Sequence, residues 1–383
     1  MSYISTTAEL SSYLNKIQDT SLLAIDTEFL REKTYYPRLC LLQLATEDTS
    51  AIVDPLVLED LSLLRPIMTD PRVTKVFHAG DQDRAILFRL FDRPVTPVFD
   101  TQSAAMVLGF PQQMGLAALV KSYCDVTLNK TDSFTDWAQR PLRETQLKYA
   151  IEDVLYLPRI YREMRDKLEK NGRMAWLEQD FRRMANSELY RIDPYQRWRK
   201  VKRSSSLTRR QLAILRELAA WRELTAQKRD YPRNWIITDE LMIEIAHREP
   251  ENTEELFKIR GLQERLGKSW SKEVVAAVQR ALATPEDMWP VRQKSKYRES
   301  DFTGALDLMT ALVHLRAKQN HISTTLLVSH DELLRLAAGE REDMAILADW
   351  RHDMVGRELL DLLEGKLVLS LQNGVLKVTD TAQ

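Results

Sequence analysis

The stretch Ser21-Leu-Leu-Ala-Ile-Asp-Thr-Glu-Phe29 places two carboxylates at the end of an apolar run. The run Leu22 to Ile25 is bounded by polar residues, a pattern that predicts a buried strand. On a strand, residues two positions apart point to the same side, so Asp26 and Glu28 should face one point in space. An Asp-x-Glu pair is by itself most often a solvated strand edge or an ion-pair partner. Its meaning therefore depends on the rest of the chain.

Two more carboxylates follow a second predicted strand, which ends in His78-Ala79-Gly80. After it, apolar residues recur at helical spacing at positions 85, 86, 88, 90 and 91. Asp81 and Asp83 therefore lie in the first turn of a predicted helix. Helix electrostatics favours acidic residues there, so capping by Asp81 and a dipole contact by Asp83 is the simplest interpretation. A ligand role for Asp83 is the alternative.

The third site is the pair Tyr149 and Asp153, in a helical pattern that runs from about Glu144 to Lys170. Residues four apart on a helix share one face, so the phenol and the carboxylate should be neighbours. Without the other sites, Tyr149 would be read as a core aromatic.

Taken together, the three sites supply four hard oxygen ligands, from Asp26, Glu28, Asp83 and Asp153. Oxygen ligands of this kind select Mg²⁺ or Mn²⁺. Four converging carboxylates repel one another, so the arrangement predicts two divalent cations that activate water and stabilise the leaving oxygen of a phosphodiester. The phenol of a free tyrosine has a pKa of about 10 and is therefore a poor base at neutral pH. Tyr149 is therefore expected to hydrogen-bond and orient the attacking water.

The order Asp-x-Glu, Asp, Tyr-x-x-x-Asp resembles the DEDD exonucleases of the tyrosine subclass, and within them the ribonuclease D family. Four further segments support the resemblance: Thr34-Tyr-Tyr-Pro-Arg-Leu-Cys-Leu-Leu-Gln-Leu44, His78-Ala-Gly80, Asp100-Thr-Gln102 and Thr135-Asp-Trp-Ala-Gln-Arg-Pro-Leu142. The resemblance implies a ribonuclease-H-like domain with a mixed sheet flanked by helices. It also implies hydrolysis of RNA from the 3′ end, with release of nucleoside 5′-monophosphates.

Composition agrees with a cytoplasmic enzyme. The 383 residues are 44% hydrophobic, which is enough for two or three packed domains. No apolar run is long enough to span a membrane, and the N-terminus lacks the pattern of a signal peptide. Cys40 and Cys124 have no zinc-site spacing and are expected to be reduced packing residues. His78 is interpreted equally well as a substrate contact or as a hydrogen-bonded structural histidine.

The net charge of −1 gives no indication of a polyanionic partner, but its distribution does. Between Arg182 and Arg233 the sequence has fifteen Lys or Arg and five Asp or Glu, a local charge of +10. In this segment, basic residues alternate with Tyr190, Tyr195 and Trp198, a composition that suits phosphate contacts and base stacking. The alternative is a solvated connector whose aromatic residues pack on the first domain. The candidate phosphate contacts are Arg199, Lys200, Lys202 and Arg203.

The second half of the chain is predicted to be helical. Residues 207 to about 283 resemble an HRDC domain, with Trp221-Arg222 and the turn Lys258-Ile-Arg-Gly-Leu262 at the marked positions. The resemblance implies nucleic-acid contacts, with Lys258 and Arg260 as candidates, although such bundles also serve as spacers. A later block resembles a divergent second HRDC domain through Trp350-Arg351 and the segment 356–360. It lacks the Arg-Gly-Leu turn. Asn373-Gly374 between two apolar strands predicts a closing hairpin.

The sequence therefore predicts an α/β domain followed by all-α domains. The expected boundaries are 1–180 for the exonuclease domain, 181–206 for a basic connector, 207–285 for the first HRDC domain and 300–383 for the second. The expected function is a metal-dependent 3′-to-5′ exoribonuclease that trims tRNA precursors and other structured RNAs in the cytoplasm. Neither a membrane nor an obligate protein partner is indicated. A 3′-to-5′ DNA exonuclease remains as an alternative, because none of these motifs reads a 2′-hydroxyl. A non-catalytic RNA-binding protein is a second alternative, and the five intact residues of the predicted site argue against it.

Overall fold

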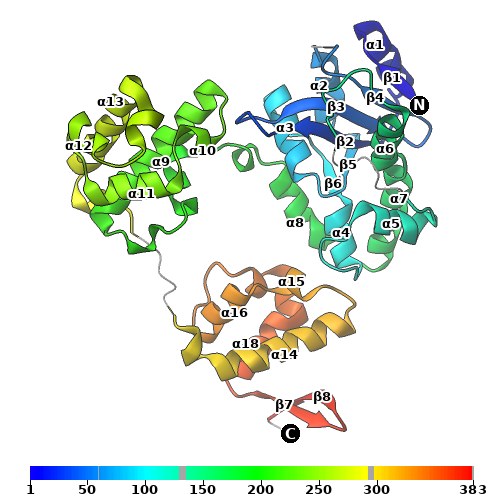
Figure 1. Ribbon diagram of the computed structural model, residues 1–383. Coiled ribbons are helices and arrows are strands. Elements are labelled where there is room, and N and C mark those ends of the chain that lie inside the picture. The colour runs from blue at the N-terminus through cyan, green and yellow to red at the C-terminus, as the bar shows by residue number, and fades with distance from the viewer. Residues whose placement is uncertain (59, 129–134, 292–296, 382–383) are drawn as a thin grey trace. The chain divides into compact units, whose positions relative to one another are not determined.

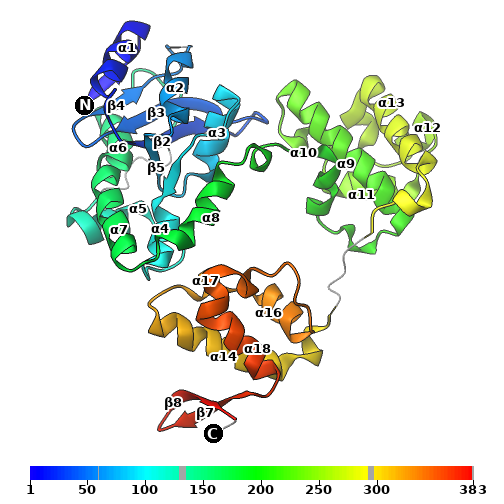
Figure 2. The same cartoon turned by 180° about the vertical axis from the view of Figure 1, so that it is seen from behind.

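The computed structural model describes residues 1–58, 60–128, 135–291 and 297–381. The chain forms two compact units (Figures 1 and 2). The first unit contains residues 1–28, 41–187 and 295–383. The second contains residues 188–294 together with residues 29–40. In the parts of the chain that the structure describes, no helix combines the length and apolar character needed to cross a bilayer.

A six-stranded mixed sheet organises the first unit, with the order β1-β4-β3-β2-β5-β6. The strands are β1 (Ser2–Ile4), β2 (Leu22–Leu30), β3 (Arg38–Ala45), β4 (Ser50–Val53), β5 (Thr74–Phe77) and β6 (Val98–Asp100). β2 is parallel to β5 and β5 to β6, whereas β3 is antiparallel to β4. The residues from Leu22 to Ile25 are buried because β2 lies inside the sheet. The strand predicted there is confirmed, and it continues through Asp26 and Glu28.

Helices flank this sheet (Figure 1). They are α1 (Thr7–Lys16), α2 (Arg65–Thr69), α3 (Asp81–Phe91), α4 (Thr101–Val107), α5 (Leu116–Cys124), α6 (Glu144–Leu155), α7 (Leu157–Lys170) and α8 (Met174–Met184). The prediction of one helix from Glu144 to Lys170 is wrong, because the chain breaks into α6 and α7 at Tyr156. The break is explained by Pro158, which supplies no backbone N–H for a continuous helix. α6 packs on β4.

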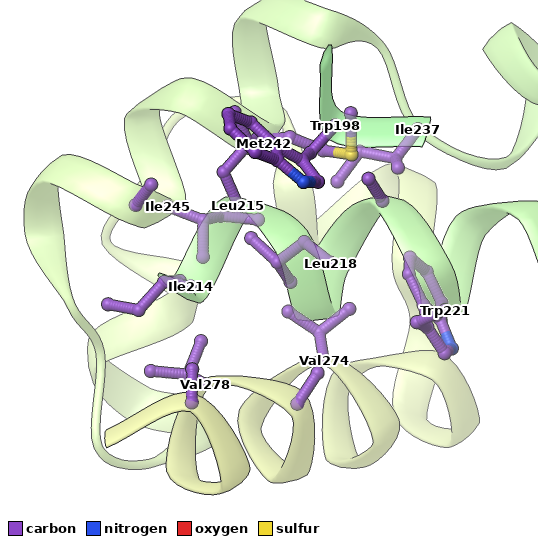
Figure 3. Packing of buried hydrophobic residues seen from close by; sticks show 14 of the residues in the cluster. Trp198, Ile214, Leu215, Leu218, Trp221, Ile237, Met242, Ile245, Val274 and Val278 are labelled. Atoms are coloured by element: carbon purple, nitrogen blue, oxygen red, sulfur yellow. The ribbon is translucent and has the colours of Figure 1, made fainter. Parts of the chain in front are cut away.

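The second unit is a helical bundle around one apolar core (Figure 3). Its main helices are α9 (Arg209–Arg229), α11 (Asp239–Arg248) and α13 (Leu262–Ala283), with the short α10 (Arg233–Ile236) and α12 (Thr253–Phe257) between them. A capping box formed by Thr208 and Gln211 starts α9. Gly261, at φ +86°, starts α13, which confirms the tight turn expected there.

The segment 29–40 joins this second unit through Tyr35 and Tyr36. The Tyr35 hydroxyl donates to the buried carboxylate of Glu223 and accepts a hydrogen bond of 3.2 Å from Gln227. The backbone N–H of Tyr36 donates to Asp230 at 3.0 Å. Glu223 also pairs with the guanidinium of Arg197 at 3.1 Å. The connection between β2 and β3 is therefore anchored on α9.

The C-terminal part of the first unit contains α14 (Thr303–Gln319), α15 (Thr324–Leu327), α16 (His330–Ala337), α17 (Asp349–Arg351) and α18 (Arg357–Leu363). Gly356 lies so close to the carbonyl oxygen of Ile346 that a Cβ atom would clash with it. The predicted hairpin is confirmed as β7 (Leu367–Gln372) and β8 (Val375–Asp380). Asn373 and Gly374 form its turn with positive φ angles, as a two-residue hairpin turn requires.

Candidate active site

Three carboxylates from two elements form the centre of the candidate site. Asp26 and Glu28 lie on β2, and Asp153 lies on α6. One carboxylate oxygen from each residue lies within 4.8 Å of the other two. All three side chains are half-buried. The two-residue spacing on the strand thus brings Asp26 and Glu28 together, and α6 adds the third carboxylate.

Asp83 is close to this cluster but is oriented by a different contact. Ala24 pairs with Val76 in the parallel ladder of β2 and β5, so the chain that leaves β5 arrives beside Asp26. α3 begins four residues after β5, and Asp83 in its first turn is buried, with 8% of its surface exposed. The Thr27 hydroxyl, which lies between the two strand carboxylates in sequence, donates to Asp83. No sequence pattern indicates this role of Thr27.

Burial and mutual repulsion raise the pKa values of these carboxylates. Burial raises the pKa of Glu28 to about 8, with further contributions from the charges of Asp153 and Asp83. Burial raises the pKa of Asp153 to about 7, with Glu152 as the next cause. The pKa of Asp26 is raised well above its ordinary value, again mainly by burial, and that of Asp83 is raised by burial. A bound cation would lower these pKa values, because it stabilises the deprotonated carboxylates.

Tyr149 lies one helical turn before Asp153 on α6, and the phenol hydrogen-bonds the Asp153 carboxylate. Burial raises the pKa of Tyr149 above its ordinary value, and the charges of Asp153, Glu28 and Asp26 add to this effect. The phenol thus stays protonated and acts as a hydrogen-bond donor at neutral pH. This geometry suits orientation of a water molecule and disfavours removal of its proton.

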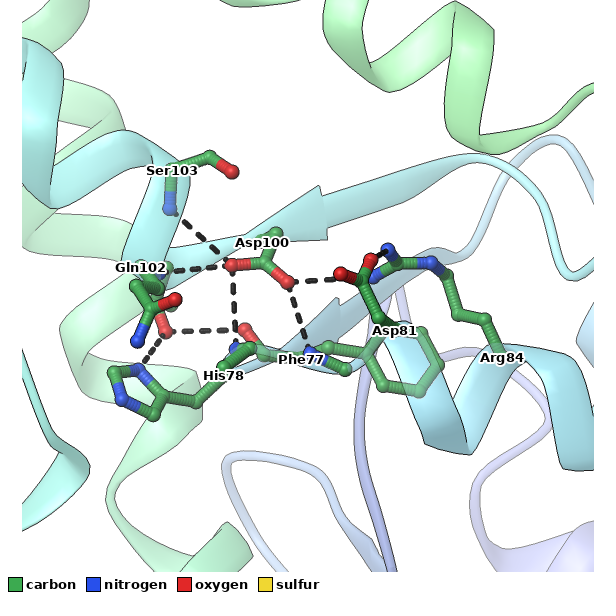
Figure 4. A network of polar contacts seen from close by, with 10 residues as sticks. Phe77, His78, Asp81, Arg84, Asp100, Gln102 and Ser103 are labelled. Carbon is green, nitrogen blue, oxygen red and sulfur yellow. Dashed lines mark hydrogen bonds and ion pairs between the residues drawn. The ribbon is translucent and has the colours of Figure 1, made fainter. Parts of the chain in front are cut away.

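A second polar network supports the chain between β5 and α3 (Figure 4). The buried Asp100 carboxylate, at the end of β6, accepts hydrogen bonds from the backbone N–H groups of Ala79 and Gly80 at 3.3 and 3.1 Å. It also caps α4 and pairs with the guanidinium of Arg84 at 3.3 Å. The side chain of Arg84 is 1% exposed. This network holds the first turn of α3, and with it Asp83, in place.

Two predictions for this region are refined by the structure. The prediction that Asp81 caps α3 is wrong, because Gly80 occupies the cap and the Asp81 carboxylate pairs with Arg84. Arg84 lies one turn further along the same helix, so its guanidinium is within reach of the Asp81 carboxylate. His78 hydrogen-bonds Thr101 through Nδ1 at 2.9 Å (Figure 4). This contact favours the structural interpretation of His78, and burial lowers the pKa of its ring.

The residues of the cluster fit divalent cations. They offer only hard carboxylate oxygens, the ligands that Mg²⁺ and Mn²⁺ prefer. Burial and mutual repulsion dominate their raised pKa values, so a bound cation would relieve the negative charge of Asp26, Glu28 and Asp153. These three residues would hold a cation directly, and Asp83 lies close enough to influence the charge of Asp26 and Glu28.

The basic residues predicted to contact RNA lie in the second unit. Their side chains are exposed and have no acidic partner among the described residues; they are Arg199, Lys200, Lys202, Arg203, Lys258 and Arg260. Trp198 is 6% exposed and part of the helical core (Figure 3), so the expectation that it stacks on bases is wrong. The alternative, packing on the first domain, is also wrong for Trp198. Tyr195 is 47% exposed.

Comparison with known proteins gives the family. A 3′–5′ exonuclease family model matches residues 1–169, and an HRDC domain model matches residues 211–278. Ribonuclease D of Sphingobium indicum is 39% identical over 376 residues, with 97% of each chain covered. The chain belongs to the ribonuclease D family. Ribonuclease D of Zymomonas mobilis is 36% identical over 98% of this chain and 97% of its own.

A solved ribonuclease D structure has the same architecture. Escherichia coli RNase D, an exoribonuclease involved in structured RNA processing, matches with a TM-score of 0.81 and 31% identity. The match covers 95% of this chain and 98% of that chain. The protein is accordingly a 3′–5′ exoribonuclease of the ribonuclease D type, with a mixed-sheet exonuclease domain and a C-terminal HRDC region.

The raised pKa values predict how the stability of the protein responds to pH and to metal. Because the pKa values of Glu28 and Asp153 are raised in the folded chain, the contribution of these two carboxyls to the free energy of unfolding without metal should fall as pH rises from about 4, the value for an unfolded carboxyl, through about 8. Divalent cations bind deprotonated carboxylates. The increase in Tm caused by Mg²⁺ should therefore be larger at about pH 8 than at about pH 6.

Differential scanning fluorimetry at the two pH values measures this increase. Asp26→Asn should remove most of the Mg²⁺ effect, because it removes a cluster oxygen and one negative charge. Equal Mg²⁺ effects in the wild type and in Asp26→Asn would show that the cation binds elsewhere.

Proposed function

We propose that the protein trims 3′ ends of structured RNAs, tRNA precursors among them, in the cytoplasm and releases nucleoside 5′-monophosphates. The observation that carries the proposal is the cluster of Asp26, Glu28 and Asp153, with the Tyr149 phenol bonded to its edge. The similarity to Escherichia coli RNase D, which processes structured RNA, suggests the substrate class. Cys40 and Cys124 are not joined in a disulfide, which suits a reducing compartment.

In this proposal, Asp26, Glu28, Asp83 and Asp153 hold two divalent cations, Mg²⁺ or Mn²⁺. Bound there, the cations would act as Lewis acids that activate water and stabilise the leaving oxygen of the phosphodiester. The Thr27 hydroxyl donates to the Asp83 carboxylate and limits its movement, and Asp100 with Arg84 fixes the turn from which Asp83 projects. The Tyr149 hydroxyl orients the attacking water. Each of these residues positions a group, and none needs to change its own protonation state during the reaction.

Different parts of the chain have different tasks in this proposal. Residues 1–180 carry the chemistry, while the connector 181–206 and the HRDC regions 207–285 and 300–383 select structured substrates. The exposed basic residues Arg199, Lys200, Lys202 and Arg203 follow one another along the connector, and Lys258 and Arg260 lie just after α12. Exposed guanidinium and ammonium groups without acidic partners suit contact with RNA phosphates.

A direct test is incubation of a 3′-extended tRNA with the full chain and Mg²⁺, with sequencing of the trimmed ends. Shortening by single nucleotides that stops near the mature end supports the proposal. A DNA oligomer of the same sequence, tested in parallel, separates the proposal from a DNA exonuclease. Equal rates on RNA and DNA would contradict the assigned substrate class.

Substitution of the central carboxylates should abolish turnover. Asp26→Asn and Asp153→Asn each remove a cation ligand, and we expect a loss of roughly 10³-fold or more in kcat because bound cations supply several kcal/mol. RNA affinity and the thermal stability measured without Mg²⁺ should change little. The matched control is Asp125→Asn, which removes an exposed carboxylate that pairs with Lys121 outside the cluster. Near wild-type release of mononucleotides by either cluster variant would refute the site.

The phenol of Tyr149 should contribute less than the carboxylates. Tyr149→Phe removes one orienting hydroxyl, and the expected loss in kcat is about 10²-fold. The control is Tyr156→Phe, which removes a hydroxyl beyond the end of the same helix, close to Glu152 and Cys124, and should leave kcat unchanged. Single-turnover rates on a short unstructured RNA measure both. An unchanged rate for Tyr149→Phe would make this residue a packing aromatic.

The basic connector should set the salt dependence of binding. For single strands the slope of log affinity against log salt decreases by about 0.7 for each phosphate that the protein no longer neutralises. Replacement of Arg199, Lys200, Lys202 and Arg203 by Gln should therefore flatten the slope and weaken binding to a tRNA precursor. The control replaces four arginines that already pair with Glu: Arg159, Arg162, Arg165 and Arg248. If both quadruple variants have the same slope, the connector makes no phosphate contacts.

A further inference from the structure

The loop that precedes α6 is anchored by an ion pair that the chemistry described so far does not use. The carboxylate of Asp54, directly after β4, has no exposed surface. The guanidinium of Arg140 donates to both of its oxygens, at 2.6 Å from Nε to Oδ2 and at 2.8 Å from Nη2 to Oδ1. These two residues are 86 positions apart in sequence. Two parallel hydrogen bonds of this kind fix the guanidinium in position and in plane.

Asp54 is itself held rigidly. Its backbone N–H donates to the carbonyl of Ile4 at 2.9 Å, and its Oδ1 accepts from the N–H of Leu56 at 3.0 Å. The Tyr3 hydroxyl donates to Oδ2. Burial opposes ionisation, but the hydrogen bonds from Arg140, Tyr3 and Leu56 keep the pKa of Asp54 below its ordinary value. Asp54 is therefore a charged, fixed point at the edge of the sheet where β1 pairs with β4.

The third nitrogen of the Arg140 guanidinium, Nη1, donates to its own loop. Nη1 donates to the carbonyl oxygen of Trp137 at 2.8 Å and to that of Gln139 at 2.9 Å. Thr135, at the start of the described part of this loop, accepts hydrogen bonds from Arg143 at 3.0 Å and from Gln146 at 3.1 Å. The loop is thus tied to α6 at one end and to Asp54 at the other. Trp137 lies between the two attachments.

The Trp137 ring, 3% exposed, packs against the ring of Tyr149. Their centroids are 6.0 Å apart and their planes are inclined by 37°. A tyrosine ring has two side-chain torsions, so a neighbour that blocks one side of the ring limits where its hydroxyl can go. The order of contacts is Asp54, Arg140, the backbone of Trp137, the ring of Trp137 and the ring of Tyr149.

We propose that Asp54 and Arg140 are positioning residues for the exonuclease reaction, which act through Trp137 to hold the Tyr149 hydroxyl at the carboxylate cluster. The inference rests on the proposed role of Tyr149. It assigns a task to the Asp-Trp-x-x-Arg-Pro segment that lies outside the metal ligands. A displacement of about 1 Å in a catalytic group reduces the rate by up to about 10²-fold, so the loss of this anchor should be visible in kcat.

The experiment compares the variants Arg140→Lys and Trp137→Phe in two backgrounds, wild type and Tyr149→Phe. Lysine keeps the charge opposite Asp54 but cannot bridge both carboxylate oxygens and the Trp137 carbonyl at once. Trp137→Phe is the milder change and keeps an aromatic side chain. Single-turnover and steady-state rates on a short RNA give kcat and KM. Arg159→Gln, which removes an exposed ion pair on α7, is the control for loss of an arginine.

In the wild-type background we expect kcat to fall about tenfold or more for Arg140→Lys and by a smaller factor for Trp137→Phe, with KM nearly unchanged. In the Tyr149→Phe background both substitutions should have almost no further effect, because the group that they position is absent. The increase in Tm caused by Mg²⁺ should stay at its wild-type value in both variants. A merely structural role would instead change KM, the Mg²⁺ effect or both.

Two results would overturn the inference. If the effects of Arg140→Lys and Tyr149→Phe multiply, the ion pair acts on something other than the phenol. If Arg140→Lys does not fold, the same test uses Trp137→Phe. When the loss of kcat in the double variant Trp137→Phe, Tyr149→Phe is the product of the two single losses, the inference is wrong. Full activity of Tyr149→Phe would be a different failure, because it would remove the proposed role of Tyr149 itself and leave the exoribonuclease assignment intact.

Discussion

The repulsion among carboxylates that share a half-buried site is the constraint on which the structure depends. Asp26, Glu28 and Asp153 come within 4.8 Å of one another, and burial raises their pKa values. Left to relax, such side chains would turn toward water. They stay together because each projects from a backbone that is fixed for other reasons, either inside the sheet or on a helix packed against it.

Each carboxylate has its own source of rigidity. The strand that carries Asp26 and Glu28 has neighbours on both sides, so it cannot shift without breaking two ladders. Asp83 depends on the turn that Asp100 and Arg84 hold, and on the hydroxyl of Thr27. Asp100 and Arg84 thus affect the position of Asp83 through the backbone of this turn. The buried Arg84 and Asp100 are paired with each other, which removes the cost of isolated buried charges.

The candidate phosphate contacts of the second unit lie in a different environment from the carboxylate cluster; they are Arg199, Lys200, Lys202, Arg203, Lys258 and Arg260. They are exposed and lie in the unit that also contains residues 29–40, the continuation of the strand that carries Glu28. Tyr35 in that segment bonds to Glu223, which also pairs with Arg197 of the connector. Contacts of α9 therefore reach both the chain that leaves the carboxylate strand and the basic connector. The aromatic residues of the connector differ in burial: Trp198 is buried in the core of the second unit, and Tyr195 is exposed.

The sequence by itself determined the features that follow from local periodicity. Residues two apart on a strand point to the same side, which made the pairing of Asp26 with Glu28 predictable. Residues four apart on a helix share one face, which did the same for Tyr149 and Asp153. Asn-Gly between two strands predicted the β7–β8 hairpin. Only the tertiary structure decided which distant groups meet. The hydroxyl of Thr27 on Asp83, the burial of Trp198 and the pairing of Arg140 with Asp54 join residues far apart in sequence. Periodicity carries no information on such partners, because they are selected by packing and by the need of each buried polar group for a hydrogen bond.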